Sequence, residues 1–413
     1  MHPKKNEELI ENIYDIYKIE KRSIPYPTII FATHSPNIVK QVIKLFDTNQ
    51  QILHFSKEPN NPTVAQVMNS QYDDKRFLNI FSDNEARLFF SNFILFVEGA
   101  TEVEIFRNQK LNKSFEKLNQ IDVYEAKESM LKYINPAYSN TSIPYLVLYD
   151  ADKFIDINIE KKKISFKKDV INLVTYCKKY QKAYLYSEQK NIYSIVKMLL
   201  DVEKSTKLDF EKNLYITTFN YSEFIQNINI YFLNKENYFL NKTTIEESLI
   251  NKNSFFLFKR WIFFEFRIII KQAYNSRTPK DIIEKTIKNK VMEIKKFKKY
   301  IDINFTKQER VTAIILIFGG KTETSITTST DNYNKLPQDF RDKIQKVKED
   351  YIQSKKSLNL GYLLGKTSGW ATSFLNFSID RIEKNRGETE FKNEFKKYFG
   401  ELYDIITIIE KKL

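Results

Sequence analysis

The 413 residues are enough for two or three domains, and 42% hydrophobic residues can supply buried cores. Lys and Arg number 66 against 52 Asp and Glu; the net charge of +14 favours a polyanionic partner such as nucleic acid. The Lys, Asn and Ile enrichment of an AT-rich genome explains part of this excess. A single cysteine, Cys177, excludes an internal disulfide, and three histidines leave too few ligands for a Cys/His zinc site.

The first ninety residues predict helices interspersed with strands. Helical spacing of apolar residues runs over 9–19, and the apolar run 28–32 predicts a buried strand. Ser35-Pro36 predicts the start of a second helix. "QQILHF" and "PTVAQV" predict two further strands, and a helix from about Asn84 leads towards the next apolar run.

From Phe93 onwards, strand and helix patterns alternate. Strands are expected at 93–97, 121–124 and 145–149, with helices from about 100 and around 128–133. This alternation predicts an α/β fold with a doubly wound parallel sheet. "IDINIEKKKISFKKD" predicts a polar hairpin, followed by helices at 168–181 and 190–204 and a strand at 214–219.

The remainder of the chain predicts mostly helices. Its most apolar stretch, "FFLFKRWIFFEFRIII", is too short and too charged to span a bilayer, so it predicts a buried helix. No signal peptide opens the chain, and we expect a soluble, cytoplasmic protein without membrane contact.

Acidic residues follow two of the predicted strands. Glu98 ends the first, Gly99 permits a turn, and Thr101 is a candidate cap for a helix whose first turn contains Glu102. For Glu102 the alternative is that it merely complements the helix dipole.

Asp150 and Asp152 end the strand 145–149, although two acidic residues can equally mark a simple turn. The carboxyl ends of parallel strands converge on one crevice, so Glu98, Glu102, Asp150 and Asp152 are expected together. Such a cluster requires protons or cations, and its hard oxygen ligands select Mg²⁺, Mn²⁺ or Ca²⁺. Two such ions can activate a phosphodiester for hydrolysis.

These motifs resemble a known family. "VEGATEVEIF" followed by "LYDADK" resembles the Toprim metal centre of primases, topoisomerases and OLD (overcoming lysogenization defect) nucleases. "IIFATHSPNIV" resembles the switch-histidine strand of ABC-type ATPases, with His34 as the histidine, and OLD proteins place such an ATPase before Toprim. "MHP" resembles the "LHP" after Walker B, which implies a chain that begins inside the ATPase domain.

The resemblance implies three regions. Residues 1–90 would be a partial ATPase remnant, 91–235 the Toprim nuclease domain, and 236–413 a mostly helical region that completes the nuclease site. Within the family, the resemblance extends to retron-linked anti-phage effectors.

Walker A and Walker B sequences are absent before His34, so no autonomous ATPase is expected. "GYLLGKTSG" is one residue short of a phosphate-binding loop, and "IFGGKTET" has Ile315 in place of its first glycine. His34 would therefore contact ATP only where the missing ATPase portion or a partner chain completes the site. Its alternative role is to cap a strand.

The resemblance implies further site residues. Lys366, in "LLGKTSGWATSFLNF", matches a lysine that reaches the metal centre and stabilises charge on the phosphate. A carboxylate for the second metal is expected at Glu223, with Glu246 or Glu247 as competitors. Arg87 and Arg107 flank the site as candidate phosphate contacts or as ordinary surface residues.

The expected function is Mg²⁺- or Mn²⁺-dependent DNA endonuclease or nickase activity, with two metal ions, in anti-phage defence. Expected partners are DNA, an ATPase chain, the retron reverse transcriptase with its msDNA, and further copies of this chain. "FKRWIFFEF" and "VMEIKKFKKYI" suit contact with DNA phosphates, or form solvated helix faces. Alternatives are a non-catalytic fragment that binds DNA or an ATPase partner, and a topoisomerase- or primase-like enzyme.

Overall fold

The structure is a computed structural model that describes most of the first 158 residues and a large part of the C-terminal region. The described ranges are 3–19, 28–56, 63–158, 163–166, 237–242, 244–251, 253–272, 299–305, 338–347, 369–384 and 387–413, with short pieces between 225 and 349. The helices predicted at 168–181 and 190–204 and the strand predicted at 214–219 lie outside the described residues.

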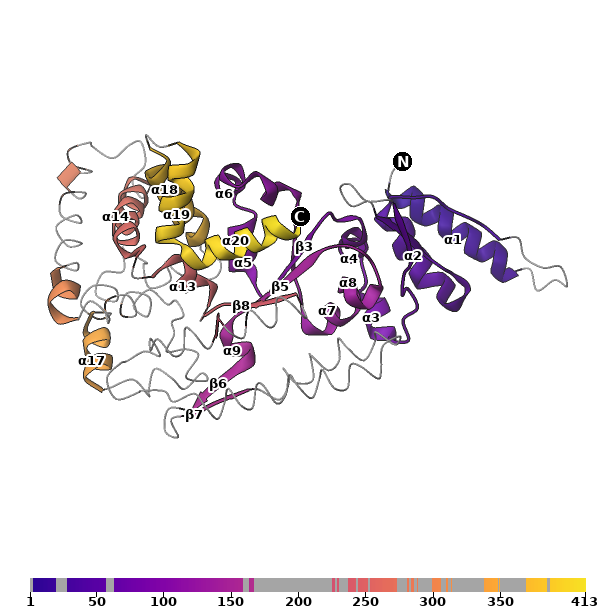
Figure 1. Cartoon of the computed structure of the whole chain (residues 1–413), viewed down its shortest axis with the longest axis horizontal. Coiled ribbons are helices and arrows are strands. Elements are labelled where there is room, and N and C mark those ends of the chain that lie inside the picture. The colour runs from indigo at the N-terminus through magenta and orange to yellow at the C-terminus, as the bar shows by residue number, and fades with distance from the viewer. Residues whose placement is uncertain are drawn as a thin grey trace.

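A four-stranded parallel sheet lies at the centre of the described chain (Figure 1). Its order is β4 (Asp122–Glu125), β3 (Ile94–Val97), β5 (Tyr145–Tyr149) and β8 (Tyr238–Leu240). Ile94 pairs with Asp122 on one side and with Tyr145 on the other. The chain moves outward from β3 to β4 and crosses back to β5, so a topological switch point lies between β3 and β5. The predicted α/β fold with a doubly wound parallel sheet is confirmed.

The side chains of successive residues in the central strands point to opposite faces of the sheet, so they pack in two different hydrophobic cores. Leu95 and Val97 pack in a core that includes residues of α5 (Ala100–Phe106), α6 (Gln109–Ser114) and the C-terminal helices. Ile94 and Phe96 pack in a second core with residues of α3 (Lys75–Ile80), α4 (Asp83–Arg87) and α7 (Glu128–Ile134). All residues of β3 and β5 are buried, as expected for strands covered on both faces.

Local signals set the ends of the connecting elements. Asp74 accepts hydrogen bonds from two backbone N–H groups at the start of α3, and Ser82 with Glu85 forms a capping box on α4. The predicted polar hairpin is confirmed as the antiparallel pair of β6 (Ile155–Asn158) and β7 (Lys163–Phe166). The remaining short elements are η2 (Leu88–Phe90), η3 (Glu116–Gln120), α8 (Pro136–Ser139) and α9 (Ala151–Phe154).

The described part of the C-terminal region is mainly helical, as predicted. Its helices are α13 (Ile245–Leu249), α14 (Phe255–Gln272), α17 (Gln338–Val347), α18 (Trp370–Glu383), α19 (Glu388–Tyr398) and α20 (Gly400–Lys412). The predicted buried helix corresponds to α14, whose Phe258 and Trp261 are buried. Among the described helices, none is long and apolar enough to cross a membrane.

The prediction of mostly helices did not anticipate a strand at 238–240, which form β8, the outer strand beside β5. Three apolar residues are too short a run to distinguish a strand from a helix by periodicity. β8 lies beyond the domain boundary predicted at 235, and its carboxyl end borders that of β5.

The N-terminal elements lie at one end of the molecule (Figure 1). They are α1 (Pro3–Ile19), α2 (Pro36–Phe46), η1 (Asp47–Asn49) and the antiparallel hairpin of β1 (Leu53–Ser56) and β2 (Val64–Val67). The two helices and two strands match predicted elements. α1 packs against α2.

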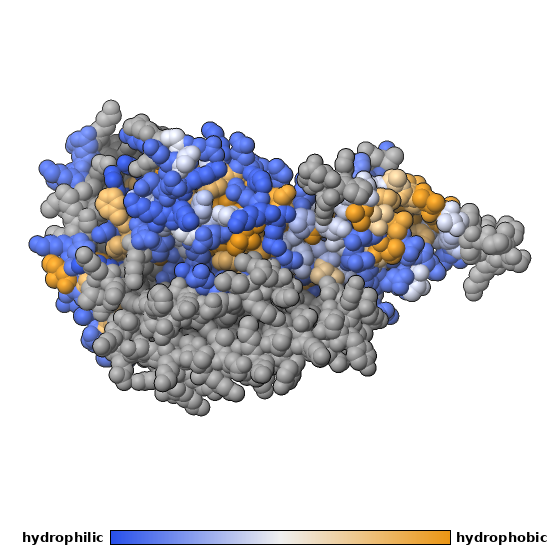
Figure 2. Space-filling view, viewed as in Figure 1, coloured by the Kyte–Doolittle hydropathy of each residue, from blue (hydrophilic) through white to orange (hydrophobic). Residues whose placement is uncertain are grey.

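The predicted buried strand at 28–32 was wrong. These residues form no strand in the structure, and Ile30 is 88% exposed. The run satisfies the sequence pattern of a buried strand, but none of the described strands pairs with it. Exposed apolar residues gather at this end of the molecule (Figure 2).

Candidate metal centre

Glu98 lies directly after β3, at the turn into α5. Gly99 is the residue before the helix and has an extended backbone with φ −155°, a conformation open to any residue. A Cβ atom at Gly99 would lie 3.4 Å from Oε2 of Glu102, within ordinary contact distance. Neither backbone conformation nor steric clash therefore requires glycine here, contrary to the expectation from the sequence.

Thr101 and Glu102 are buried in the first turn of α5, with exposed fractions of 3% and 4%. The prediction that Thr101 caps this helix was wrong, because the helix begins at Ala100 and places Thr101 inside it. The Thr101 hydroxyl instead donates a 3.3 Å hydrogen bond to Oε1 of Glu246 in α13. A residue near β3 thus contacts a carboxylate that follows β8.

Asp150, directly after β5, connects three segments of the site. Its Oδ1 atom accepts hydrogen bonds of 3.0 Å from Nδ2 of Asn241 and of 3.0 Å from the backbone N–H of Ile245. Its own backbone N–H donates to Oε2 of Glu98 over 3.4 Å. Asp150 therefore links the ends of β3 and β5 to the chain that follows β8. In Figure 1, α5, α9 and α13 gather around this end of the sheet.

The site concentrates negative charge in a buried environment. Burial raises the pKa of Asp150 well above its usual range, and the nearby charges of Glu102, Glu246 and Glu98 raise it further. The hydrogen bond from Asn241 acts in the opposite direction. Lys153 Nζ lies 3.9 Å from Oε1 of Glu98 on the more exposed side of the cluster. A buried group of this kind is stabilised by a cation, which offsets the repulsion.

The donor chemistry fits a hard divalent cation. Carboxylate oxygens are the preferred ligands of Mg²⁺ and Mn²⁺, and Asp150, Glu102 and Glu246 are all at least nine-tenths buried. No three His, Cys, Asp or Glu side chains among those described are arranged to hold one ion as they stand. The backbone of Asp152 is in α9, and its side chain lies outside the described set.

Of the candidates for the additional carboxylate, the structure describes Glu246 and Glu247. Glu246 is 8% exposed and lies near Asp150, and Glu247, next to it in α13, is less buried. Glu223 and Lys366 lie outside the described residues. Sequence reasoning missed Asn241, whose only local signal is a polar residue directly after the short apolar run Tyr238–Leu240.

Arg87 and Arg107 both bond to β4. Arg87 Nη1 lies 3.0 Å from Oδ1 of Asp122, and Arg107 Nη2 donates to the carbonyl oxygen of Val123 over 2.7 Å. These bonds hold α4 and the end of α5 against the sheet. They give both arginines a role in packing against β4 that does not depend on contact with phosphate.

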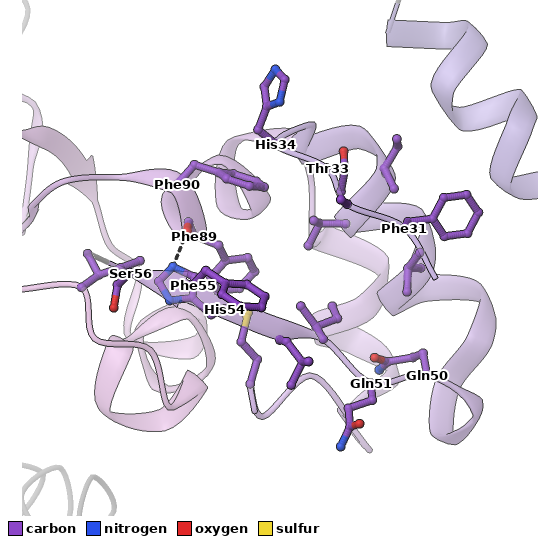
Figure 3. A pocket seen from close by; sticks show the side chains of 18 of the residues that line it. Phe31, Thr33, His34, Gln50, Gln51, His54, Phe55, Ser56, Phe89 and Phe90 are labelled. Carbon is purple, nitrogen blue, oxygen red and sulfur yellow. Dashed lines mark hydrogen bonds between the residues drawn. The ribbon is translucent and has the colours of Figure 1, made fainter. Parts of the chain in front are cut away.

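His34 lines a cavity of about 2190 Å³ between the N-terminal helices and β1 (Figure 3). His34 is exposed, and the strand it was expected to cap is absent from the described structure. His54 is the more firmly held histidine, because its Nε2 lies 3.0 Å from the carbonyl oxygen of Phe89. Burial lowers the pKa of His54, so the neutral imidazole is favoured. The expected contact of His34 with ATP stays a prediction.

The fold and site define an α/β domain whose carboxylates meet at the switch point of a parallel sheet. Residues 89–152 match the family model described as "Overcoming lysogenization defect protein-like, TOPRIM domain". This segment includes Glu98, Glu102, Asp150 and Asp152, and it is an OLD-like Toprim domain, as the sequence motifs predicted. The presence of an OLD-like Toprim domain suggests that the chain binds a divalent metal and has a nuclease-type activity on DNA.

No solved structure matched the chain. The family match covers the Toprim segment alone, so the ATPase remnant and the retron link stay predictions.

Proposed function

We propose that this chain is a divalent-metal-dependent DNA endonuclease or nickase. The main support is the placement of Glu98, Glu102, Asp150 and Glu246 at the carboxyl ends of β3, β5 and β8. Ligands of doubly wound sheets bind at such a switch point, and this one lies in an OLD-like Toprim domain.

In this proposal Glu98, Glu102, Asp150 and Asp152 hold Mg²⁺ or Mn²⁺, and Glu246 contributes the carboxylate for a second ion. Glu246 is preferred to Glu223 because its charge acts on Asp150 and its Oε1 accepts from Thr101. The bound ions would supply Lewis-acid activation of the scissile phosphodiester. The two hydrogen bonds to Oδ1 of Asp150 hold this carboxylate in a fixed orientation.

Lys366 is proposed to neutralise charge that develops on the phosphate in the transition state. Lys366 precedes α18 by a few residues, and α18 packs against α5 and α13, the helices of Glu102 and Glu246. The net charge of +14 supports sequence-independent contact with the DNA backbone.

The proposed biological role is defence against phage, with an ATPase portion or partner chain as sensor. Expression of the wild-type chain with its neighbouring genes should lower phage plaque counts, and Asp150→Ala should restore them. Equal plaque counts for wild type, Asp150→Ala and an empty vector would contradict the defence role while leaving DNA cleavage to be judged separately.

The cleavage assay uses supercoiled plasmid with purified chain and Mg²⁺, Mn²⁺ or EDTA. Glu98→Ala, Asp150→Ala and Glu246→Ala are compared with Glu125→Gln. Glu125 ends β4 at the same edge of the sheet but is exposed, which makes it a matched carboxylate control. Metal-dependent nicking or linearisation should be abolished by the three alanine substitutions and retained by Glu125→Gln.

Intact plasmid in every lane, also after addition of an ATPase partner chain, would contradict the nuclease proposal and favour a role in binding. Cleavage that persists in EDTA, or in Asp150→Ala protein, would contradict the proposed site.

A further inference from the structure

Asn241 lies at the end of β8 and is fully buried. Its backbone N–H donates to the carbonyl oxygen of Tyr149 over 2.8 Å, which extends the parallel pairing of β5 and β8 by one residue. Its Nδ2 atom donates to Oδ1 of Asp150 over 3.0 Å. The backbone of Asn241 is thus fixed by the sheet, and its side chain is fixed by an acidic residue of the site.

The other amide atom of Asn241 has no such partner. Oδ1 is buried and makes no hydrogen bond among the described residues, and the same holds for Oγ1 of Thr244. Leaving a buried acceptor without a hydrogen bond destabilises the folded state, because the acceptor loses its hydration without a replacement. An atom of this kind in a native site is commonly satisfied by a water molecule or an ion.

The position of this oxygen is constrained by the covalent geometry of the amide. Nδ2 and Oδ1 are bonded to the same carbon, so Oδ1 lies within a few ångströms of the Asp150 carboxylate. Oδ1 of Asp150 already accepts two hydrogen bonds, from Asn241 and Ile245, which leaves Oδ2 for a cation. A neutral amide oxygen adds a hard donor without adding to the negative charge.

We propose that Asn241 is a positioning residue and oxygen donor of the metal centre. Its Nδ2 holds the carboxylate of Asp150, and its Oδ1 binds the divalent cation, directly or through a water molecule. The inference rests on the proposed function and assigns to it a residue outside the matched Toprim segment.

Asn229 provides a matched control. It is also a buried asparagine beside β8, but its Nδ2 donates to the carbonyl oxygen of Leu240 over 2.8 Å and its Oδ1 accepts from the Leu240 N–H over 2.7 Å. Both of its amide atoms are therefore satisfied by backbone. Loss of Asn229 should lower stability without changing metal affinity.

The test is Mn²⁺ binding by isothermal titration calorimetry, together with the shift in Tm that Mn²⁺ produces. Asn241→Ala should weaken Mn²⁺ binding by about 10–100-fold, the usual effect of losing a residue that orients metal ligands. Asn229→Ala should bind Mn²⁺ as wild type does. Asn241→Asp keeps an oxygen for the cation and adds a charge, although it loses the Nδ2 donor to Asp150. It should therefore bind Mn²⁺ more tightly than Asn241→Ala and show a larger Mn²⁺-induced rise in Tm than wild type.

Wild-type affinity in Asn241→Ala would overturn the inference, as would binding by Asn241→Asp that is as weak as in Asn241→Ala. If Asn241→Ala does not fold, Asn241→Asp decides the matter, because an unchanged Mn²⁺-induced shift would place residue 241 away from the ion. Wild-type protein that binds no Mn²⁺ contradicts the proposed function itself. The inference alone fails where wild type binds Mn²⁺ and Asn241→Ala binds it with the same affinity.

Discussion

Oε1 of Glu104 accepts a 2.7 Å hydrogen bond from the backbone N–H of Thr372. Glu104 is on α5, two residues after Glu102, and Thr372 lies in the first turn of α18. Gly369, the residue before α18, has a φ of +70°, a left-handed conformation that favours glycine. The bond therefore fixes the start of α18 to α5, the helix that carries the candidate metal ligand Glu102. Lys366 precedes the start of α18 by a few residues in the sequence.

Glu104→Ala should lower the rate of DNA cleavage without weakening Mn²⁺ binding, because the start of α18 loses its anchor. A loss of about tenfold in kcat is expected, and Glu104→Gln should retain most activity because its amide oxygen can still accept from Thr372. Kinetics on plasmid DNA, with Mn²⁺ calorimetry, measure both quantities.

A double-mutant comparison tests whether Glu104 acts through Lys366. Adding Glu104→Ala to Lys366→Ala should produce little further loss of kcat. Full additivity of the two losses would contradict this route and assign Glu104 a purely structural role.

Asp150→Asn should make the metal-free protein more stable while it abolishes cleavage. The substitution removes a carboxyl group whose ionised form is disfavoured by burial and by the charges of Glu102 and Glu246. The asparagine oxygen can still accept from Asn241 and Ile245. The free energy of unfolding in EDTA should rise by about 1–3 kcal/mol, measured by urea denaturation. Lower stability of Asp150→Asn in EDTA would show that the repulsion at this site is already compensated within the protein.

Burial of Glu401 should make the free energy of unfolding depend on pH. It lies in the first turn of α20, accepts a 2.6 Å hydrogen bond from the backbone N–H of Lys242, and burial raises its pKa to about 7. A raised folded-state pKa means that the native state binds more protons, so this contribution to stability is lost as pH rises from about 4.5 through about 7.

Glu401→Gln should therefore have a smaller loss of unfolding free energy between pH 5 and pH 8 than wild type, measured by urea denaturation in EDTA. The two proteins should differ most above pH 7, where the wild-type carboxylate is charged. Parallel pH profiles for the two proteins would show that the pKa of Glu401 is close to its ordinary value.

Arg87→Ala should leave DNA cleavage within about twofold of wild type and lower stability by no more than about 1 kcal/mol. Its guanidinium is partly exposed and pairs with Asp122, which also accepts a 2.7 Å hydrogen bond from Ser91. Cleavage rates and Tm values decide between the two roles considered for this arginine. A large rise in the KM of Arg87→Ala for DNA, with an unchanged Tm, would instead support contact between Arg87 and the DNA phosphates.

Local sequence determined the strands and the acidic residues at their ends. The apolar runs at 94–97 and 145–149 are long enough to predict buried strands, and Glu98 and Asp150 follow them directly. Each acidic residue is fixed to the end of its strand by the local sequence, and the carboxyl ends of parallel strands lie at the same edge of a sheet. The sequence therefore predicted both carboxylates at that edge. The strand predicted from the apolar run at 28–32 was wrong, because a buried strand also requires a partner strand, and the apolar pattern of one segment does not show whether a partner exists.

Only the tertiary structure showed what surrounds these carboxylates. Asn241 reaches Asp150 across 91 residues, Thr101 reaches Glu246 across 145, and Glu104 reaches Thr372 across 268. The periodicity of the sequence does not show which of these residues meet. They are brought together by the pairing of β8 with β5 and by the packing of α18 against α5. The residue types of the metal centre are thus local properties of the chain, whereas the hydrogen bonds that orient them exist only once the sheet and the C-terminal helices have assembled.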